Sequence, residues 1–251
     1  MIVVLMLAGV YYYGKVIKGV ISTIRWAADT FIESDYPHYT SYNIRIPQGY
    51  TLHGIDVSHH QGKINWDKVA AMQERDVRID FAFIKATEGV LLIDQYFQRN
   101  WKLASKAGLL RGAYHYFKPK KAGLWQANLF LQAVNFEKGD LLPVVDIEET
   151  GGKSKTELQK NLTVFLNQVE KKLGVKPIIY TGYKFYLDNL DGQFNEYPIW
   201  IAHYYRSKPK TDVKWKFWQH SDKARIDGII YNVDMNVFNG DVDDLEKLVM
   251  P

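Results

Sequence analysis

The stretch LLPVVDIEE, at residues 141–149, is an apolar run that ends in three carboxylates. Short apolar runs of this kind are typical of strands that are buried on both faces of a parallel sheet. Side chains two residues apart in a strand share a face, so Asp146 and Glu148 are expected to point the same way. The stretch therefore predicts a buried strand with two neighbouring carboxylates at its carboxyl end.

Apolar runs of similar length recur along the chain from residue 53 onward. They span residues 53–57, 81–86, 110–117, 142–147, 177–181, 198–202, 216–219 and 233–238. Helical patterns separate the first five runs, and one of them begins at a capping box of Ser154 and Glu157 and ends at Gly174. Eight such strands with helices between them predict an α/β fold, an irregular (β/α) barrel of the TIM type. Because the last connections are short or irregular, we expect incomplete helices in the last third of the barrel.

Polar and aromatic side chains occur at the end of nearly every predicted strand. In chain order they are Asp56 with His59, Glu88, Tyr114 with His115 and Tyr116, Asp146 with Glu148, Tyr180, residues 200–204, Gln219 and Asp234. The carboxyl ends of barrel strands meet on one face, so we expect these side chains to line one cleft. Asp56 and Asp234, on the first and last strands, become neighbours if the barrel closes. We expect Glu88 to cap a turn rather than to contact a substrate.

The carboxylates of Asp146 and Glu148 favour glycoside hydrolysis. Two close carboxylates cannot both ionise cheaply, so one of them keeps a proton near neutral pH. Glycosidases need such a proton donor together with a carboxylate that stabilises or attacks the sugar cation. A metal site, or two solvated carboxylates in a loop, are the alternatives that this short motif leaves open.

We predict no metal and no cofactor. Histidines in or near the predicted strand ends lack the spacing of a zinc motif, and carboxylate chemistry needs no metal. These histidines are His59, His60, His115, His203 and His220.

The composition agrees with a globular enzyme and excludes several other classes. Hydrophobic residues make up 47% and charged residues 24% of the 251 residues, which excludes a disordered chain. The formal net charge of +4 is too small to indicate nucleic acid binding. The sequence contains no cysteine, which excludes disulfides, thiolate catalysis and Cys-bound zinc. The 14% of aromatic residues suits a core and also a cleft that stacks on sugar rings.

The N-terminal residues differ from the rest of the chain. Residues 1–14 contain no charged side chain, and basic residues follow. We interpret residues 1–28 as a membrane anchor or signal-like segment, with a cleaved signal peptide and a buried helix as alternatives. Residues 29–52 are polar, rich in Tyr and broken by two prolines, which predicts a linker or an arm laid on the domain. Residues 53–251 then form the barrel domain, and we expect a chain that begins near Thr51 to fold.

Eight motifs follow one another in a fixed order along the chain. They are GIDVSHHQG (54–62), FAFIKATEG (81–89), RGAYHYF (111–117), PVVDIEE (143–149), PIIYTG (177–182), WIAHY (200–204), FWQHS (217–221) and VDMNVFNG (233–240). In this order they resemble the motifs of family-25 glycoside hydrolases, the Chalaropsis-type lysozymes. The resemblance runs from about residue 53 to residue 248. It implies an irregular β/α barrel that cleaves the β-1,4 bond between N-acetylmuramic acid and N-acetylglucosamine in peptidoglycan.

The resemblance also implies roles for individual residues. Glu148 matches the general acid/base and Asp146 the carboxylate beside it, while Asp56 and Asp234 match two further acids of the cleft. The lining that the resemblance implies consists of Tyr114, Tyr180, Trp200, Tyr204 and Gln219. His203 and Glu149 are mild departures from the family pattern.

We therefore expect a muramidase that acts outside the cytoplasmic membrane. Asp146 and Glu148 are expected to lie too close together for a water between them, which disfavours inversion and favours retention of the anomeric configuration. The D-x-E spacing resembles that of hydrolases that use the 2-acetamido group of the substrate, and a covalent glycosyl-enzyme on an aspartate is the alternative. Peptidoglycan glycan strands are the expected partner of a monomeric protein, and the anchor interpretation adds attachment to the membrane. A peptidoglycan-binding module without turnover and a chitinase-like hydrolase are the alternatives.

Overall fold

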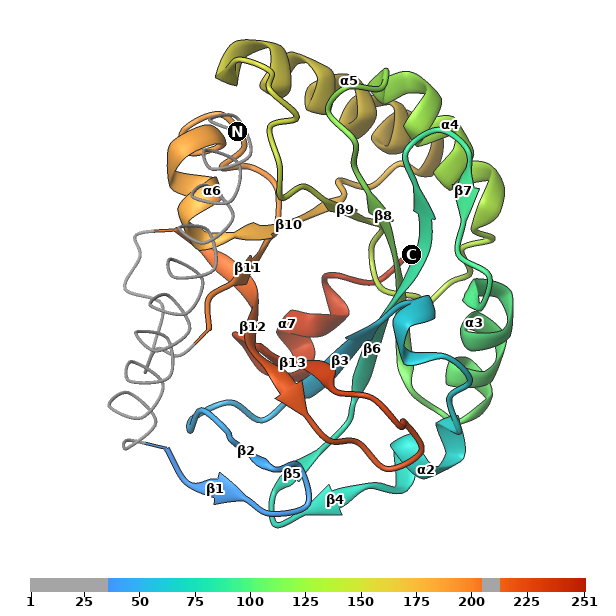
Figure 1. Ribbon diagram of the computed structural model, residues 1–251, viewed down its shortest axis with the longest axis vertical. Coiled ribbons are helices and arrows are strands. Elements are labelled where there is room, and N and C mark those ends of the chain that lie inside the picture. Colours follow the sequence, from blue (N-terminus) through green and yellow to red (C-terminus); the bar gives the residue numbers. More distant parts are fainter. Residues whose placement is uncertain (1–35, 205–212) are drawn as a thin grey trace, which may run out of the picture.

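Eight strands close into a barrel in the computed structural model, which describes residues 36–204 and 213–251 (Figure 1). The barrel strands are β3 (His53–Val57), β6 (Phe81–Glu88), β8 (Leu110–Tyr116), β9 (Val144–Asp146), β10 (Ile178–Gly182), β11 (Ile199–Ala202), β12 (Trp215–Ala224) and β13 (Val233–Phe238). Strand β3 pairs with both β6 and β13, which closes the ring. The predicted α/β barrel is confirmed, and every predicted strand overlaps an observed one.

Strand β13 runs against its neighbours, which the sequence prediction of a parallel sheet did not include. The pairs from β3 through β12 are parallel, whereas β13 is antiparallel to both β12 and β3. The reason is the short connection at residues 225–232, which contains no helix and can only return the chain as a hairpin. Asp234, near the start of β13, therefore lies beside Asp56 at the carboxyl ends of the parallel strands.

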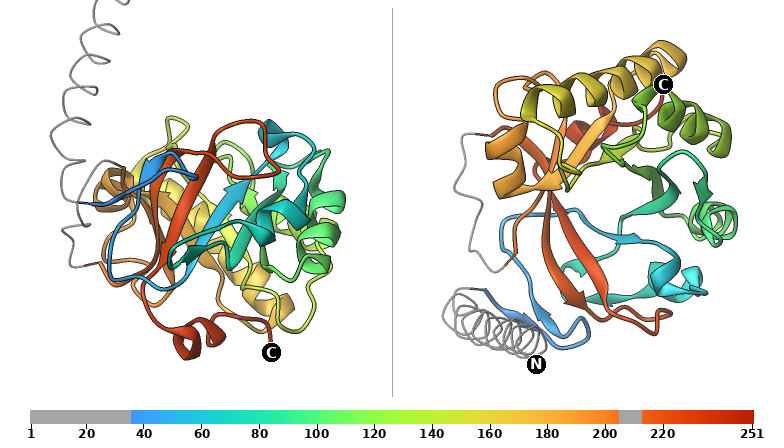
Figure 2. Two further views of the ribbon diagram at one scale, coloured as in Figure 1. Left: turned by 90° about the horizontal axis from the view of Figure 1, so that it is seen from below. Right: turned by 45° about the horizontal axis from the view of Figure 1, so that its top comes forward.

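The described residues form six α-helices around the barrel (Figures 1 and 2). They are α2 (Trp66–Ala71), α3 (Phe97–Lys106), α4 (Gly123–Ala133), α5 (Lys155–Leu173), α6 (Tyr183–Asn189) and α7 (Val242–Glu246). Helix α7 follows β13 and closes the end of the barrel where the parallel strands begin, because Leu245 packs with the side chains of the barrel interior. None of these helices is long and apolar enough to cross a lipid bilayer.

The longest helix, α5, begins and ends where the sequence predicts. The Ser154 hydroxyl accepts a hydrogen bond from the Glu157 backbone N–H, and the Glu157 carboxylate accepts one from the Ser154 N–H. Gly174 ends the helix with a φ of 73°, a left-handed conformation that suits glycine. The predicted capping box and helix end are confirmed.

The barrel interior is apolar at one end and polar at the other. Phe83 stacks on Trp200 with ring centroids 4.4 Å apart and meets Phe217 edge to face at 5.2 Å. We call these three rings the aromatic floor. The next inward positions toward the mouth are polar, since Lys85 follows Phe83 and Gln219 follows Phe217 on the same strand face. The fold thus places a polar layer directly above an apolar support.

Residues 36–52 pack against the barrel domain. They form a hairpin of β1 (His38–Tyr39) and β2 (Ile44–Arg45), next to a second hairpin of β4 (Gln73–Glu74) and β5 (Val77–Arg78). Tyr42 and Ile46 are fully buried, and the Tyr42 hydroxyl donates a hydrogen bond of 3.1 Å to the Val77 carbonyl. The described part of the arm is thus laid on the domain. The domain boundary at residue 53 stays a prediction, and the anchor or signal predicted at residues 1–28 lies outside the described residues.

Candidate active site

Four carboxyl groups gather at the mouth of the barrel. Asp56 ends the inward face of β3, Asp146 is the last residue of β9, and Asp234 lies near the start of β13. Glu148 follows β9 by two residues and is exposed, whereas Asp56 and Asp146 are buried. The structure therefore brings together the four acids that the sequence analysis named.

Asp56 and Asp234 form a coupled carboxyl pair. They are paired across β3 and β13, and a hydrogen bond joins their side chains. Asp56 Oδ2 also accepts hydrogen bonds from Gln219 Nε2 at 2.8 Å and from Asn236 Nδ2 at 2.7 Å. Burial raises the pKa of both carboxyls, and the charge of Asp56 raises that of Asp234 further. The pair consequently keeps a proton at a pH where two free aspartates are both ionised.

Asp146 and Glu148 form the second carboxyl pair. Burial raises the pKa of Asp146 well above its ordinary value, and the charge of Glu148 adds to this effect. Burial also raises the pKa of Glu148, while the Tyr180 hydroxyl and the charge of Lys85 oppose the shift. Asp146 Oδ1 is buried and has no hydrogen-bond partner among the described residues. A buried carboxyl oxygen without a donor disfavours the ionised form, which agrees with the raised pKa of Asp146.

A chain of hydrogen bonds connects Glu148 with Asp56. The Tyr180 hydroxyl lies 2.7 Å from Gln219 Oε1 and 3.3 Å from Glu148 Oε1. The Tyr204 hydroxyl donates to the same Gln219 oxygen at 2.5 Å, and the Gln219 amide nitrogen donates to Asp56. Because the Tyr180 hydroxyl has one proton, it can donate a hydrogen bond to either Glu148 or Gln219, but not to both at once. A change of protonation at one carboxyl can therefore be transmitted to the other.

Trp200 differs from its predicted place in the exposed lining. Its side chain is 2% exposed because it belongs to the aromatic floor, and its indole N–H donates a 2.8 Å hydrogen bond to Asn236 Oδ1. The ring therefore supports the site from below and leaves no free face for a sugar. Gln219 and Tyr180 are also buried and act through the hydrogen bonds above, whereas Tyr114 and Tyr204 are partly exposed.

Two residues of the site were missed by the sequence analysis. Asn236 donates to Asp56 and accepts from Trp200, so it fixes both. Lys85 is buried within β6, and its ammonium group lies 2.7 Å from Glu88 Oε2. Each left a signal in the sequence, since Asn236 follows Asp234 by two positions on one strand face and Lys85 interrupts an apolar strand.

Lys118 connects two loops at the rim of the mouth. Its ammonium group lies 3.3 Å from the carboxylate of Glu88, the last residue of β6, and 3.3 Å from that of Glu149, which follows β9. Glu88 thus forms ion pairs with Lys85 and Lys118, and the turn cap expected for it stays a prediction. We call this ion-pair group the Lys118 bridge.

The histidines do not form a common site. His115 is buried under α4, where its ring contacts Thr87 Oγ1 at 2.7 Å and Gln126 Oε1 at 3.1 Å. Within residues 36–204 and 213–251, no group of three His, Asp or Glu side chains could hold a metal ion.

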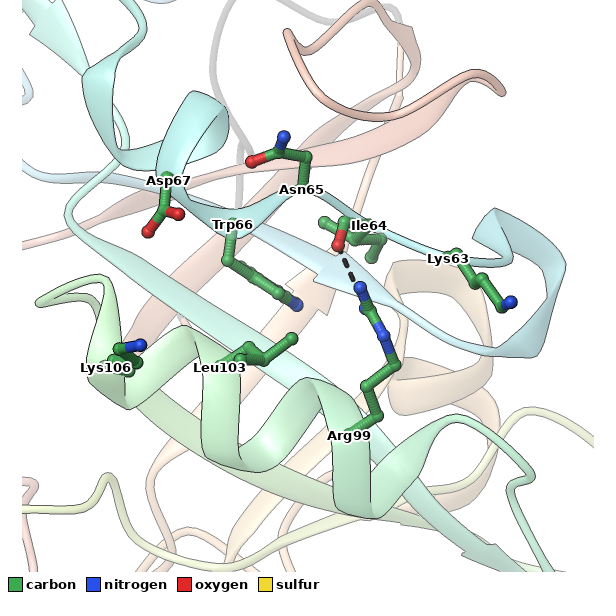
Figure 3. A pocket seen from close by; sticks show the side chains of 8 residues that line it. All are labelled: Lys63, Ile64, Asn65, Trp66, Asp67, Arg99, Leu103 and Lys106. Carbon is green, nitrogen blue, oxygen red and sulfur yellow. Dashed lines mark hydrogen bonds between the residues drawn. The ribbon is translucent and has the colours of Figure 1, made fainter.

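A hollow between α2 and α3 lies apart from the carboxyl pairs (Figure 3). Its volume is about 330 Å³, and Lys63, Lys106 and Arg99 line it. Arg99 donates a 2.9 Å hydrogen bond to the Ile64 carbonyl. The Trp66 ring is buried there, and its N–H is bound to Asn100. No predicted site residue lines this hollow.

The profile of Glycosyl hydrolases family 25 matches residues 55–229. The chain belongs to this family. The resemblance on which the sequence prediction rested is thereby confirmed. The matched range of the family 25 domain includes Asp56, Asp146 and Glu148, and Asp234 follows it as the strand partner of Asp56.

Three relatives illustrate the range of similarity to this family 25 domain. Uncharacterized protein YegX of Escherichia coli O6:H1 is 52% identical over 90% of this chain and 86% of its own length. Lysozyme M1 of Streptomyces globisporus is 33% identical over 75% of this chain and 68% of its own length. The solved structure of a family 25 glycosyl hydrolase from Bacillus anthracis is 30% identical, with a TM-score of 0.76 over 86% of this chain and 99% of its own.

Proposed function

We propose that this protein is a muramidase that hydrolyses the β-1,4 bond between N-acetylmuramic acid and N-acetylglucosamine in peptidoglycan. The observation that carries the proposal is the carboxyl pair at the mouth, in which a buried Asp146 lies beside an exposed Glu148 of raised pKa. The similarity to Lysozyme M1 supports the choice of substrate.

Glu148 is the proton donor in this proposal. It is exposed at the mouth and can reach the oxygen of a bound glycosidic bond. Its raised pKa keeps the carboxyl protonated at a higher pH than a free glutamate, as a general acid requires. As the bond between C1 and the bridging oxygen breaks, the Glu148 proton moves to that oxygen. The resulting carboxylate then removes a proton from the water that attacks C1.

Asp146 orients the 2-acetamido group of the sugar whose C1 reacts. Its carboxyl accepts a hydrogen bond from the acetamido N–H, which turns the acetamido oxygen toward C1. This oxygen attacks C1 as the leaving group departs, and the hydrogen bond from the acetamido group to the Asp146 carboxyl stabilises the positive ring that forms. Water opens that ring from the opposite face, so the two displacements retain the anomeric configuration. Asp56 and Asp234 balance the charge of the cleft.

The site of action in this proposal is outside the cytoplasmic membrane, because the peptidoglycan layer lies there. Cell fractionation followed by protease treatment of intact and of opened cells tests this location. Protection of the barrel domain from protease in cells whose outer layers are opened but whose cytoplasmic membrane is intact would contradict it.

Digestion of purified peptidoglycan with mass analysis of the reducing ends tests the function. We expect new N-acetylmuramic acid reducing ends and a Glu148→Gln variant that is slower by about 10²–10⁴-fold, the usual contribution of general acid catalysis. Glu149→Gln is the matched control, since it removes the neighbouring carboxyl, and it should stay within about tenfold of the parent. Binding without turnover would favour the binding module, and cleavage of chitin oligomers alone would favour the chitinase-like alternative.

A further inference from the structure

Helix α4 and strand β7 (Leu92–Ile93) lie on one flank of the barrel (Figure 1). Large apolar side chains of α4 and of the turn from β6 to β7 are exposed. Leu91 is 88% exposed and Trp125 is 66% exposed. Both line one groove of about 520 Å³, together with Lys120, Lys121 and residues of α4. We call it the flank groove. Its volume lies within the range of small-molecule sites, whereas isolated exposed apolar side chains need no such explanation.

One face of α4 presents a ring and two amides to the flank groove. Trp125, Asn128 and Gln132 are spaced by three and four residues, which puts them on one side of the helix. Asn128 Oδ1 accepts a 2.8 Å hydrogen bond from Gln168, which fixes the amide and leaves its nitrogen as a donor. An exposed indole ring with amide groups beside it suits a sugar, whose ring has an apolar face and whose edge carries hydroxyl and acetamido groups.

Two lysines give the flank groove a positive end. Lys120 and Lys121 are exposed and line the groove, and neither forms an ion pair within the part of the chain that the structure describes. Lys118, two residues earlier, is by contrast engaged by two glutamates. The uncompensated lysines favour a ligand that carries carboxylates.

The flank groove adjoins the rim of the candidate active site. Gly89 and Val90 continue directly from Glu88 of the Lys118 bridge, and Gly89 packs against the Lys118 side chain. Lys120 lies against Gly151 in the loop that follows Glu149. A polymer bound at the mouth therefore has neighbouring units within reach of the groove.

The hollow between α2 and α3 provides a contrast. It is also lined by basic side chains, but its tryptophan is buried and the indole N–H is already bonded to Asn100. No aromatic face is free there for a sugar ring, so its positive charge alone does not indicate the same ligand.

We propose that the flank groove is a second peptidoglycan site, which binds an N-acetylated sugar unit through Trp125 and the carboxylates of its stem peptide through Lys120 and Lys121. The identity of the polymer rests on the proposed function. The groove holds the enzyme on the insoluble wall while the mouth performs the hydrolysis. Short soluble fragments do not fill both sites and gain nothing from it.

A pelleting assay of the full chain with purified insoluble peptidoglycan tests the proposal. The assay is done on ice, before digestion releases soluble product. We expect Trp125→Ala and the double variant Lys120→Ala/Lys121→Ala each to weaken binding by about tenfold or more, as loss of a central contact does. Hydrolysis of short soluble glycan fragments should stay unchanged. Removal of the stem peptides with an amidase should abolish the effect of the lysine variant but not that of Trp125→Ala.

Two matched controls accompany these variants. Lys63→Ala/Lys106→Ala removes the same charge from the other hollow, and Tyr231→Ala removes an exposed ring from the β12–β13 hairpin. Both should bind like the parent. Equal binding by all variants would overturn the proposal, as would Trp125-dependent binding to vesicles of anionic phospholipid without binding to peptidoglycan. Because pelleting needs no turnover, a parent that binds through Trp125 but does not hydrolyse would reject the proposed function alone.

Discussion

At the scale of single residues, the acetamido mechanism depends on Asp146. Asp146→Asn keeps the shape of the side chain but replaces the carboxyl group that orients and stabilises the acetamido group. We expect turnover to fall by about 10²-fold or more while glycan binding persists. Steady-state kinetics together with pelleting on peptidoglycan check this expectation.

The stereochemistry of the same reaction provides an independent test. NMR of the first product should show the β-anomer before mutarotation, and mass spectrometry of the trapped enzyme should show no glycosyl adduct. An α-anomer as the first product would reject retention. An adduct on an aspartate would reject the acetamido route.

We expect Lys85 to influence the pH range of the proposed activity. Its charge lowers the pKa of both Asp146 and Glu148. Lys85→Met removes this charge, so both carboxyls keep their protons to higher pH. We expect the acid and the basic limbs of the pH profile of kcat/KM to move to higher pH. Lys63→Met, in the separate hollow, should leave both limbs in place, and a shift to lower pH would show that Lys85 acts in another way.

At the scale of elements, the hairpin of β1 and β2 is expected to stabilise the barrel. Ile46 is fully buried, and the Tyr42 carbonyl accepts a 2.8 Å hydrogen bond from the Arg225 backbone N–H. A chain that begins at residue 51 loses these contacts, so we expect it to unfold at a lower Tm than a chain that begins at residue 36. The sequence alone led to the expectation that the shorter chain folds.

A point substitution in the hairpin tests whether the packing of its buried side chains, rather than the length of the chain, stabilises the barrel. Ile46→Ala should lower the free energy of unfolding by about 2–5 kcal/mol, the range for buried large-to-small changes. His38→Ala, at an exposed position of the same hairpin, should change it by less than about 0.5 kcal/mol. Chemical denaturation measures the stability of the two shortened chains and of the two variants. Equal stability of all four would show that the hairpin does not stabilise the barrel.

At the scale of the whole molecule, the carboxyl pairs reduce stability in exchange for function. The pKa of Asp234 is raised in the folded state, mainly by burial and then by the charge of Asp56. A raised carboxyl pKa contributes stability that is fully present below the unfolded pKa and is lost as the pH rises through the folded pKa. The wild-type protein should therefore lose stability as the pH rises above the ordinary aspartate range.

Asp234→Asn tests this pH dependence because the amide cannot ionise. We expect a higher Tm than the parent at about pH 8 and little difference at about pH 4, where the native carboxyl is protonated. Thermal unfolding across the pH range measures this difference. Asp243→Asn, at an exposed position of α7, is the control and should change the pH dependence of the Tm little. A Tm gain that is equal at both pH values would show that the amide improves packing instead.

Short-range patterns in the sequence determined the strands, the barrel class, the α5 capping box and the four acids. Each of these depends on neighbouring residues: the apolar run before Asp146, the spacing of Ser154 and Glu157, and the position of polar residues at strand ends. The burial of an apolar strand and the hydrogen bonding of the backbone groups at a helix end depend on residues close together in the chain. Both can therefore be predicted from the sequence alone. The match to Glycosyl hydrolases family 25 agrees with this part of the prediction.

Only the tertiary structure decided how distant residues meet. The antiparallel direction of β13 placed Asp234 beside Asp56, and closure of the barrel brought Asn236 to Asp56 and Trp200. The same closure buried Trp200 in the aromatic floor, against the expectation from its place at a strand end. The pKa of each carboxyl depends on burial and on charges far away in the chain, and these exist only once the barrel has closed.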